Sequence, residues 1–212
     1  ASEKKYLYSS TALNAANSSQ FQALNNAEDF TYSFYLYKQS VANGKSTIFW
    51  LGNQSRETAV RISYVETTND YLNVTINSET TTYSLNSTTL TNSTLYHVAV
   101  IKNDTRLSIY INNVEVAYTT LPDTFTLKDI VTGETPYIMF GGDYAGTTLG
   151  DPSGYHLAAL TYISEFAMFD YALSSADINA MYYSVANGAT LASETSDDYC
   201  NAECIIDGQR SE

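Results

Sequence analysis

Tyrosine is the residue type in this chain whose number and spacing point most directly to binding chemistry. The chain has 19 tyrosines but a single tryptophan. A tyrosine ring stacks on the flat face of a sugar, and its hydroxyl keeps a partly exposed ring compatible with water. Alternation along residues 30–37 places Tyr35 and Tyr37 opposite the apolar Phe34 and Leu36. We therefore expect both tyrosines on the outer surface of a sheet.

Two further tyrosines, Tyr144 and Tyr155, lie in the longest glycine-rich stretch, residues 141–155. Loops at the rim of a β-sandwich often carry binding residues. The four tyrosines predict a surface that binds a glycan or packs against a neighbouring subunit, because interfaces are also enriched in tyrosine. The alternative is that β-strands simply favour tyrosine and that residues 141–155 only connect two sheets.

The two cysteines, Cys200 and Cys204, lie close together in an acidic stretch. A disulfide between them is feasible but geometrically awkward, because it would close a very small ring. Pairing with another chain or with residues beyond 212 is an alternative, as are free thiols. Two thiols without a nearby histidine are too few for a zinc site.

Six Asn-x-Ser/Thr triplets make N-glycosylation a further candidate modification, provided that the protein passes through a eukaryotic secretory route. Chance alone produces about four such triplets in a chain this rich in serine and threonine, so the pattern is weak evidence. Two of them lie in the polar connection before Leu95. The candidate asparagines are Asn17, Asn53, Asn73, Asn86, Asn92 and Asn103.

The charge of the chain excludes some classes of partner. It carries 10 basic and 23 acidic residues, a formal net charge of −13. Binding to nucleic acid or to an anionic membrane needs clustered lysine and arginine. No apolar run approaches the roughly 20 residues that span a bilayer. We therefore expect neither nucleic acid nor insertion into a membrane.

Short runs of alternating apolar and polar residues predict β-strands through the central 150 residues. Asn112–Asn113 tolerates the positive φ of a tight hairpin, across which Ile109 would pair with Val116 and Leu107 with Tyr118. Proline is rare and no Gly/Ser linker divides the chain, so we predict one domain over residues 1–188 and an acidic tail over 189–212. The strand-like runs lie at residues 30–37, 60–64, 72–76, 96–100, 107–111, 114–118 and 136–140.

The segment from Leu160 to Tyr183 changes from the period of a strand to that of a helix. Apolar residues first alternate, with Ile163, Phe166 and Met168 among them, and then follow helical spacing. Ser174 can cap the helix, and Asp177, three residues later, favours its positive end. The pattern predicts a last strand followed by one short helix.

Residues 163–174 of this segment resemble the closing motif of laminin-G-like and concanavalin-like β-sandwiches, usually written IDEV-x-IYNRALS. Residues 27–36, 47–52, 95–100, 107–116 and 137–142 resemble five strands of the same family, in the family's order. The resemblance implies an all-β jelly roll of two antiparallel sheets with one short C-terminal helix. It also implies a non-catalytic module, secreted or at the cell surface, that binds a glycan or an extracellular protein through its rim loops. The main alternative is a self-assembling structural subunit of a filament or coat.

Glycoside hydrolases of related fold need two carboxylates about 5 to 10 Å apart on one face. Their E-x-D-x-x-E pattern is absent here, and the five-residue spacing of Glu165 and Asp170 points the two side chains to opposite faces. His97 stands where the non-catalytic family also has histidine, which favours a packed imidazole over a base. We therefore expect no enzymatic activity, and a hydrolase is the least favoured alternative.

Calcium is the usual cofactor of the wider fold, held by acidic and carbonyl oxygens at a loop rim. Residues 69–74 resemble the laminin-G segment GDYL-x-L, which implies Asp70 as a calcium ligand. Asp143 and Asp151 are further oxygen donors. However, Ser164 replaces the aspartate of the closing motif, and an Asn-Asp pair is also common in turns. The alternative is that these acids only cap turns.

Overall fold

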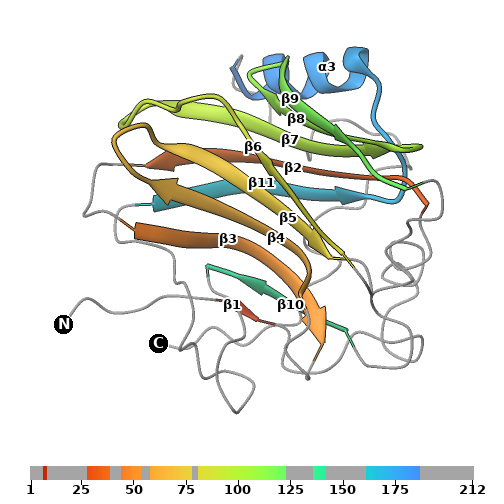
Figure 1. The fold of residues 1–212 in the computed structure, drawn as a ribbon. Helices are drawn as coiled ribbons and strands as arrows, with labels where there is room; N and C mark the ends of the chain where they lie inside the picture. Colours follow the sequence, from red (N-terminus) through yellow and green to blue (C-terminus); the bar gives the residue numbers. More distant parts are fainter. Residues whose placement is uncertain are drawn as a thin grey trace.

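Two antiparallel β-sheets pack face to face, and one helix lies on the outside of the sandwich (Figure 1). The computed structural model describes residues 7–8, 28–38, 44–53, 58–77, 81–122, 136–141 and 161–186. Several predictions fall outside these residues: the tail over 189–212, Cys200, Cys204, Tyr144, Tyr155, Asp143, Asp151 and Asn17.

The sheets and the helix have the predicted architecture of a jelly roll. The first sheet contains, in spatial order, β1 (Leu7–Tyr8), β10 (Pro136–Phe140), β3 (Gly44–Asn53), β4 (Thr58–Glu66), β5 (Tyr71–Asn77) and β6 (Thr82–Asn86). The second contains β11 (Thr161–Phe169), β2 (Phe30–Lys38), β7 (Leu95–Asn103), β8 (Arg106–Ile111) and β9 (Val114–Thr120). Helix α3 (Ser175–Ala186) follows β11.

The core lies between the sheets, where the predicted inward faces meet. On β2, Phe30, Tyr32, Phe34 and Leu36 are almost completely buried, as the alternation predicts. Full burial of a large apolar side chain contributes about 1.5 to 3 kcal/mol, so these two layers account for much of the driving force for folding. The facing sheet contributes Val60, Ile62, Tyr64, Leu72, Val74 and Ile76.

The β8–β9 hairpin turns at Asn112 and Asn113, whose φ angles are 50° and 64°, so the predicted tight turn is confirmed. The predicted pairing beyond it is wrong in register. A bulge at Ile109/Tyr110 sets Ile109 opposite Ala117 and Ser108 opposite Tyr118. The bulge therefore leaves Tyr118 on the outer face, 58% exposed.

A second bulge interrupts β11. Ser164 pairs with Tyr35 and Ala167 pairs with Ser33, so Glu165 and Phe166 share the space opposite one residue of β2. Glu165 adopts a φ of 50°, a left-handed conformation that costs a residue other than glycine about 1 kcal/mol. The bulge is what allows both Ile163 and Phe166 to pack toward the core, which strict alternation forbids.

Helix α3 begins with the predicted cap. The Ser174 hydroxyl accepts a hydrogen bond from the backbone N–H of Asp177 at 3.2 Å, and the Asp177 carboxylate accepts from the Ser174 backbone N–H at 2.9 Å. Ile178 and Met181 pack into a small apolar cluster on the outer face of the second sheet, which also contains Ala99, Ile101, Ala167 and Phe169. The helix thereby covers part of this face.

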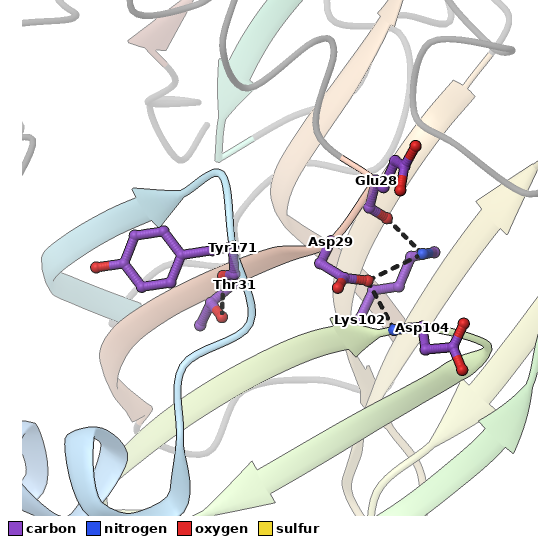
Figure 2. Close-up of polar contacts among 6 residues, drawn as sticks. All are labelled: Glu28, Asp29, Thr31, Lys102, Asp104 and Tyr171. Carbon is purple, nitrogen blue, oxygen red and sulfur yellow. Dashed lines mark hydrogen bonds and ion pairs between the residues drawn. The ribbon is translucent and has the colours of Figure 1, made fainter.

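Polar contacts tie the start of β2 to the turn after β7 and to the chain after β11 (Figure 2). The buried Lys102 ammonium donates to the carbonyl of Glu28 and lies 3.3 Å from the Asp29 carboxylate. The same carboxylate accepts the backbone N–H of Asp104 at 2.7 Å. Thr31 donates to the carbonyl of Tyr171 at 3.0 Å. These contacts hold one end of the sandwich together.

We expect Asp29→Ala to lower the free energy of unfolding by about 2 kcal/mol, because it leaves the buried Lys102 charge without its carboxylate. The value is below that of a fully buried pair because the Asp29 side chain is 34% exposed. Urea unfolding measures the change. The exposed Asp170 is the control, and Asp170→Ala should stay within about 0.5 kcal/mol of the native chain. Equal effects of the two substitutions would contradict the assigned role of Asp29.

Candidate functional site

A row of aromatic and apolar side chains crosses the outer face of the second sheet, with a half-buried Tyr37 between two exposed residues. Tyr37 lies directly between Tyr162 on β11 and Leu95 on β7 in the strand register. The rings of Tyr37 and Tyr162 lie 6.0 Å apart at an angle of 49°. Tyr162 is 57% exposed and Leu95 is 54% exposed. We call Tyr37, Leu95 and Tyr162 the tyrosine platform.

Helix α3 runs along β2 toward the platform. Near the start of the helix, the Leu173 backbone N–H donates to Thr31. Further along, the Tyr35 hydroxyl donates to the carbonyls of Met181 and Tyr182, at 3.2 and 2.9 Å. The helix therefore ends in the direction of Tyr37, and its last turns add the paired rings of Tyr182 and Tyr183, with centroids 5.0 Å apart.

The prediction for Tyr35 needs correction, whereas Tyr37 is on the surface as predicted. Tyr35 lies on the outer face of its sheet, but α3 covers it and leaves it 5% exposed. Burial raises the pKa of its hydroxyl to about 12. Tyr35 therefore anchors the helix and cannot contact a ligand in this structure.

Tyr162 and Leu95 were not among the site residues predicted from the sequence. The alternation around Ile163 already places Tyr162 on the outer face, and this signal was available. The pairing with Tyr37 was not, because it joins residues far apart in the chain.

His97 is packed beneath α3, as predicted for a histidine that is not a base. It is 1% exposed, and its Nε2 lies 2.9 Å from the Ser33 hydroxyl. Its ring contacts Tyr35, with centroids 5.0 Å apart, and lies 6.2 Å from Tyr182. Burial lowers the pKa of the imidazole to about 4.

Asp70, the implied calcium ligand, accepts hydrogen bonds through both of its carboxylate oxygens. One oxygen accepts the Thr67 backbone N–H at 3.0 Å and the other accepts the Tyr64 hydroxyl at 3.2 Å. Within the described ranges, no three His, Cys, Asp or Glu side chains gather as metal ligands would. The carboxylate of Asp70 therefore fits its alternative role, which is to cap a turn.

The candidate glycosylation sites differ in their surroundings. Asn73 is buried, and its amide donates to Ser84 at 2.8 Å and to Asn86 at 2.7 Å, so this prediction is wrong for the folded chain. Asn86 and Asn103 are exposed and Asn92 is half-buried. Modification of these three stays a prediction. The side chain of Asn53 is outside the described part of the structure.

The profile of the Concanavalin A-like lectin/glucanases superfamily matches residues 9–179 of the chain. A search of curated proteins returned no match. No helix of the described residues has the length and apolar character to cross a bilayer.

Solved structures of similar fold share little sequence with this chain. A heptameric SAP-like pentraxin from Limulus polyphemus has a TM-score of 0.59 and 12% identity, over 84% of this chain and 75% of its own. The binding domain of Botulinum Neurotoxin DC in complex with SialylT has a TM-score of 0.59 and 16% identity, over 85% of this chain but only 42% of its own. A Trypanosoma rangeli sialidase has a TM-score of 0.54 and 16% identity, over 81% of this chain and 25% of its own. These likenesses support the jelly-roll fold.

Proposed function

Because this chain belongs to the Concanavalin A-like lectin/glucanases superfamily, we propose that it is a non-catalytic module that recognises a glycan at the tyrosine platform. The observation that carries the proposal is the neighbouring pair Tyr37 and Tyr162 on the outer sheet face. A sugar ring can stack on such a pair while the hydroxyls reach its polar edge. Leu95 extends the apolar surface on the other side of Tyr37.

Two further observations support glycan as the ligand. The binding domain of Botulinum Neurotoxin DC, which has the same fold, was solved in complex with SialylT, and cell entry of the similar botulinum neurotoxin type C depends on interaction with two ganglioside molecules. The platform residues also lie on paired strands, so little ordering of the backbone is needed when a ligand binds. We place the module outside the cell, as a secreted or surface-bound domain.

The proposal of a non-catalytic role rests on the number of carboxylates near the platform. Among the described side chains of β11, Glu165 is the single carboxylate, whereas glycosidic bond cleavage generally requires two. Incubation with oligosaccharides that bind the platform should release no shorter product. Cleavage that Glu165→Gln abolishes would replace this proposal with a hydrolase.

Binding of the native chain to a glycan array, followed by competition with the free sugar, tests the proposed function. Saturable binding that free sugar displaces is the expected result. The tyrosine platform would also suit a subunit interface, which was the main alternative from the sequence. Large ordered assemblies in sedimentation, together with no binding to any glycan, would favour that structural role instead.

We expect glycan binding at the platform to persist when calcium is removed. Tyr37, Leu95 and Tyr162 offer no set of carboxylate or carbonyl side-chain oxygens of the kind that calcium requires. Titration calorimetry with and without a chelator should give dissociation constants within about twofold. A calcium requirement would instead place the ligand at a rim loop, where Asp143 and Asp151 were the predicted oxygen donors.

A further inference from the structure

Glu165 occupies a backbone position that suits glycine. Its φ of 50° falls in the left-handed region, at the bulge between Ser164 and Ala167 of β11. Bulges with this conformation usually place glycine there, because glycine has no Cβ to clash. A strained residue that keeps a charged side chain on an edge strand is a candidate for a functional role. The strain thus draws attention to the carboxylate of Glu165.

The Glu165 carboxylate belongs to the residue after Ser164, which pairs with Tyr35 in the strand register. Within the described part of the chain, no hydrogen bond or ion pair engages it, although the side chain is half-buried. Burial is the main cause that raises the pKa of the Tyr35 hydroxyl. The negative charge of Glu165 raises it further. Tyr35 lies under the last turns of α3. Glu165 is therefore beside the helix end, and three residues, about 10 Å of strand, separate it from Tyr162.

The surroundings of Glu165 add negative rather than positive potential. The last turn of α3 contains no basic residue, and the carbonyl end of a helix carries a partial negative charge. Lys102 and Arg106 already pair with Asp29 and Glu115. The whole chain carries a net charge of −13. A cationic group would be attracted to this end of the outer face, and an anionic group would be repelled.

We propose that Glu165 makes the tyrosine platform selective for glycans that carry a free amino group, and that it disfavours acidic glycans. This inference rests on the proposed function and names the class of sugar that the same site takes. One sugar ring stacks on Tyr37 and Tyr162, and a linked ring extends along β11 toward Glu165. Its protonated amine then donates a charge-assisted hydrogen bond to the carboxylate.

Three matched oligosaccharides of equal length test the selectivity by titration calorimetry at low salt and at a mildly acidic pH. They are a glucosamine oligomer, its fully N-acetylated form and a sialylated oligosaccharide. Acetylation removes the positive charge but keeps the stacking surface. The native chain is expected to bind the amine form about tenfold more tightly than the acetylated form, and the acidic form more weakly than both.

Three variants separate the effect of Glu165 from that of the general charge of the protein. Glu165→Gln should remove the preference for the amine form while the affinity for the acetylated form stays within about twofold. Asp170→Asn removes one negative charge at the end of the same strand and should keep the preference. Glu165→Gly retains the backbone conformation at least as well, so a loss of preference there cannot result from misfolding.

Two sets of results would overturn the inference in different ways. If the native chain binds the amine and acetylated forms equally, or if Glu165→Gln keeps the preference, Glu165 does not select the ligand, although the platform still binds sugar. If none of the three oligosaccharides binds, the proposed function fails at this platform, and this inference fails with it.

Discussion

Replacing Tyr37 and Tyr162 together with alanine is expected to weaken glycan binding about a hundredfold. Each ring provides a stacking surface, and loss of one such contact in a binding site commonly costs about 1.4 kcal/mol, a factor of ten. Each single substitution should therefore weaken binding about tenfold. Titration calorimetry with the best ligand of the native chain measures all three variants.

Tyr118 provides a matched control for these substitutions. It has nearly the same exposure as Tyr162 and lies on the same sheet, but on the opposite edge strand, β9. Tyr118→Ala should leave the dissociation constant within about twofold. Because Tyr162 is largely exposed, Tyr162→Ala should also leave the urea midpoint nearly unchanged. If the Tyr118 and Tyr162 variants lose binding equally, the ligand does not lie on the platform.

The features of the fold that were predicted correctly depend on residues close together in the sequence. The inward face of β2 follows from the two-residue period of a strand. The turn at Asn112–Asn113 follows from the tolerance of asparagine for positive φ, and the helix start follows from Ser174 and Asp177. Each of these features depends only on residues that are close together in the chain, so the sequence alone was sufficient to predict it.

The bulges were not predicted, because each one shifts the register of a strand pair and no residue type in the sequence marks the position. Neither Glu165 nor Val116, the residue of β9 that the register skips, is a glycine, so nothing marked the extra residue in either strand. The bulge in β11 contains Glu165, the carboxylate on which the proposed selectivity depends. This part of the candidate site was therefore visible only in the structure.

The candidate site itself combines local and distant information. Alternation placed Tyr35 and Tyr37 on the same face, but it could not show that α3 covers one and leaves the other at the surface. That difference depends on the hydrogen bonds from Tyr35 to Met181 and Tyr182, about 147 residues away. Likewise, Tyr37 and Tyr162 become neighbours only through strand pairing. Long-range contacts decide which tyrosines a ligand can reach.

Acid is expected to destabilise the chain through His97 and to loosen α3. The folded state holds the pKa of His97 at about 4, below the value of about 6.5 for an unfolded chain. The unfolded state therefore binds the proton more readily, and the contribution of His97 to stability is fully present above about pH 6.5. It falls as the pH drops toward 4, by about 2 kcal/mol at pH 5 and about 3 kcal/mol near pH 4.

The structure indicates where this destabilisation acts. A protonated imidazole would be buried between Tyr35 and Tyr182, and its Nδ1 has no hydrogen-bond partner among the described residues. On β11, the second strand from β7, the Glu165 carboxylate acts on the Tyr35 hydroxyl. Moving α3 away would admit water to the imidazole at less cost than unfolding the sandwich. The protection factors of the α3 amide protons, which correct for the effect of pH on intrinsic exchange, should therefore be lower at pH 5 than at pH 7.

Urea unfolding of the native chain and of His97→Gln at several pH values isolates this contribution. Carboxylates titrate in both proteins, so the difference between the two curves reports His97. We expect the native chain to lose about 2 kcal/mol more than the variant between pH 7 and pH 5. The chain has two histidines, so nuclear magnetic resonance can follow the protonation of His97 directly. Parallel curves, or a measured pKa near 6.5, would show that burial under α3 does not hold His97 neutral.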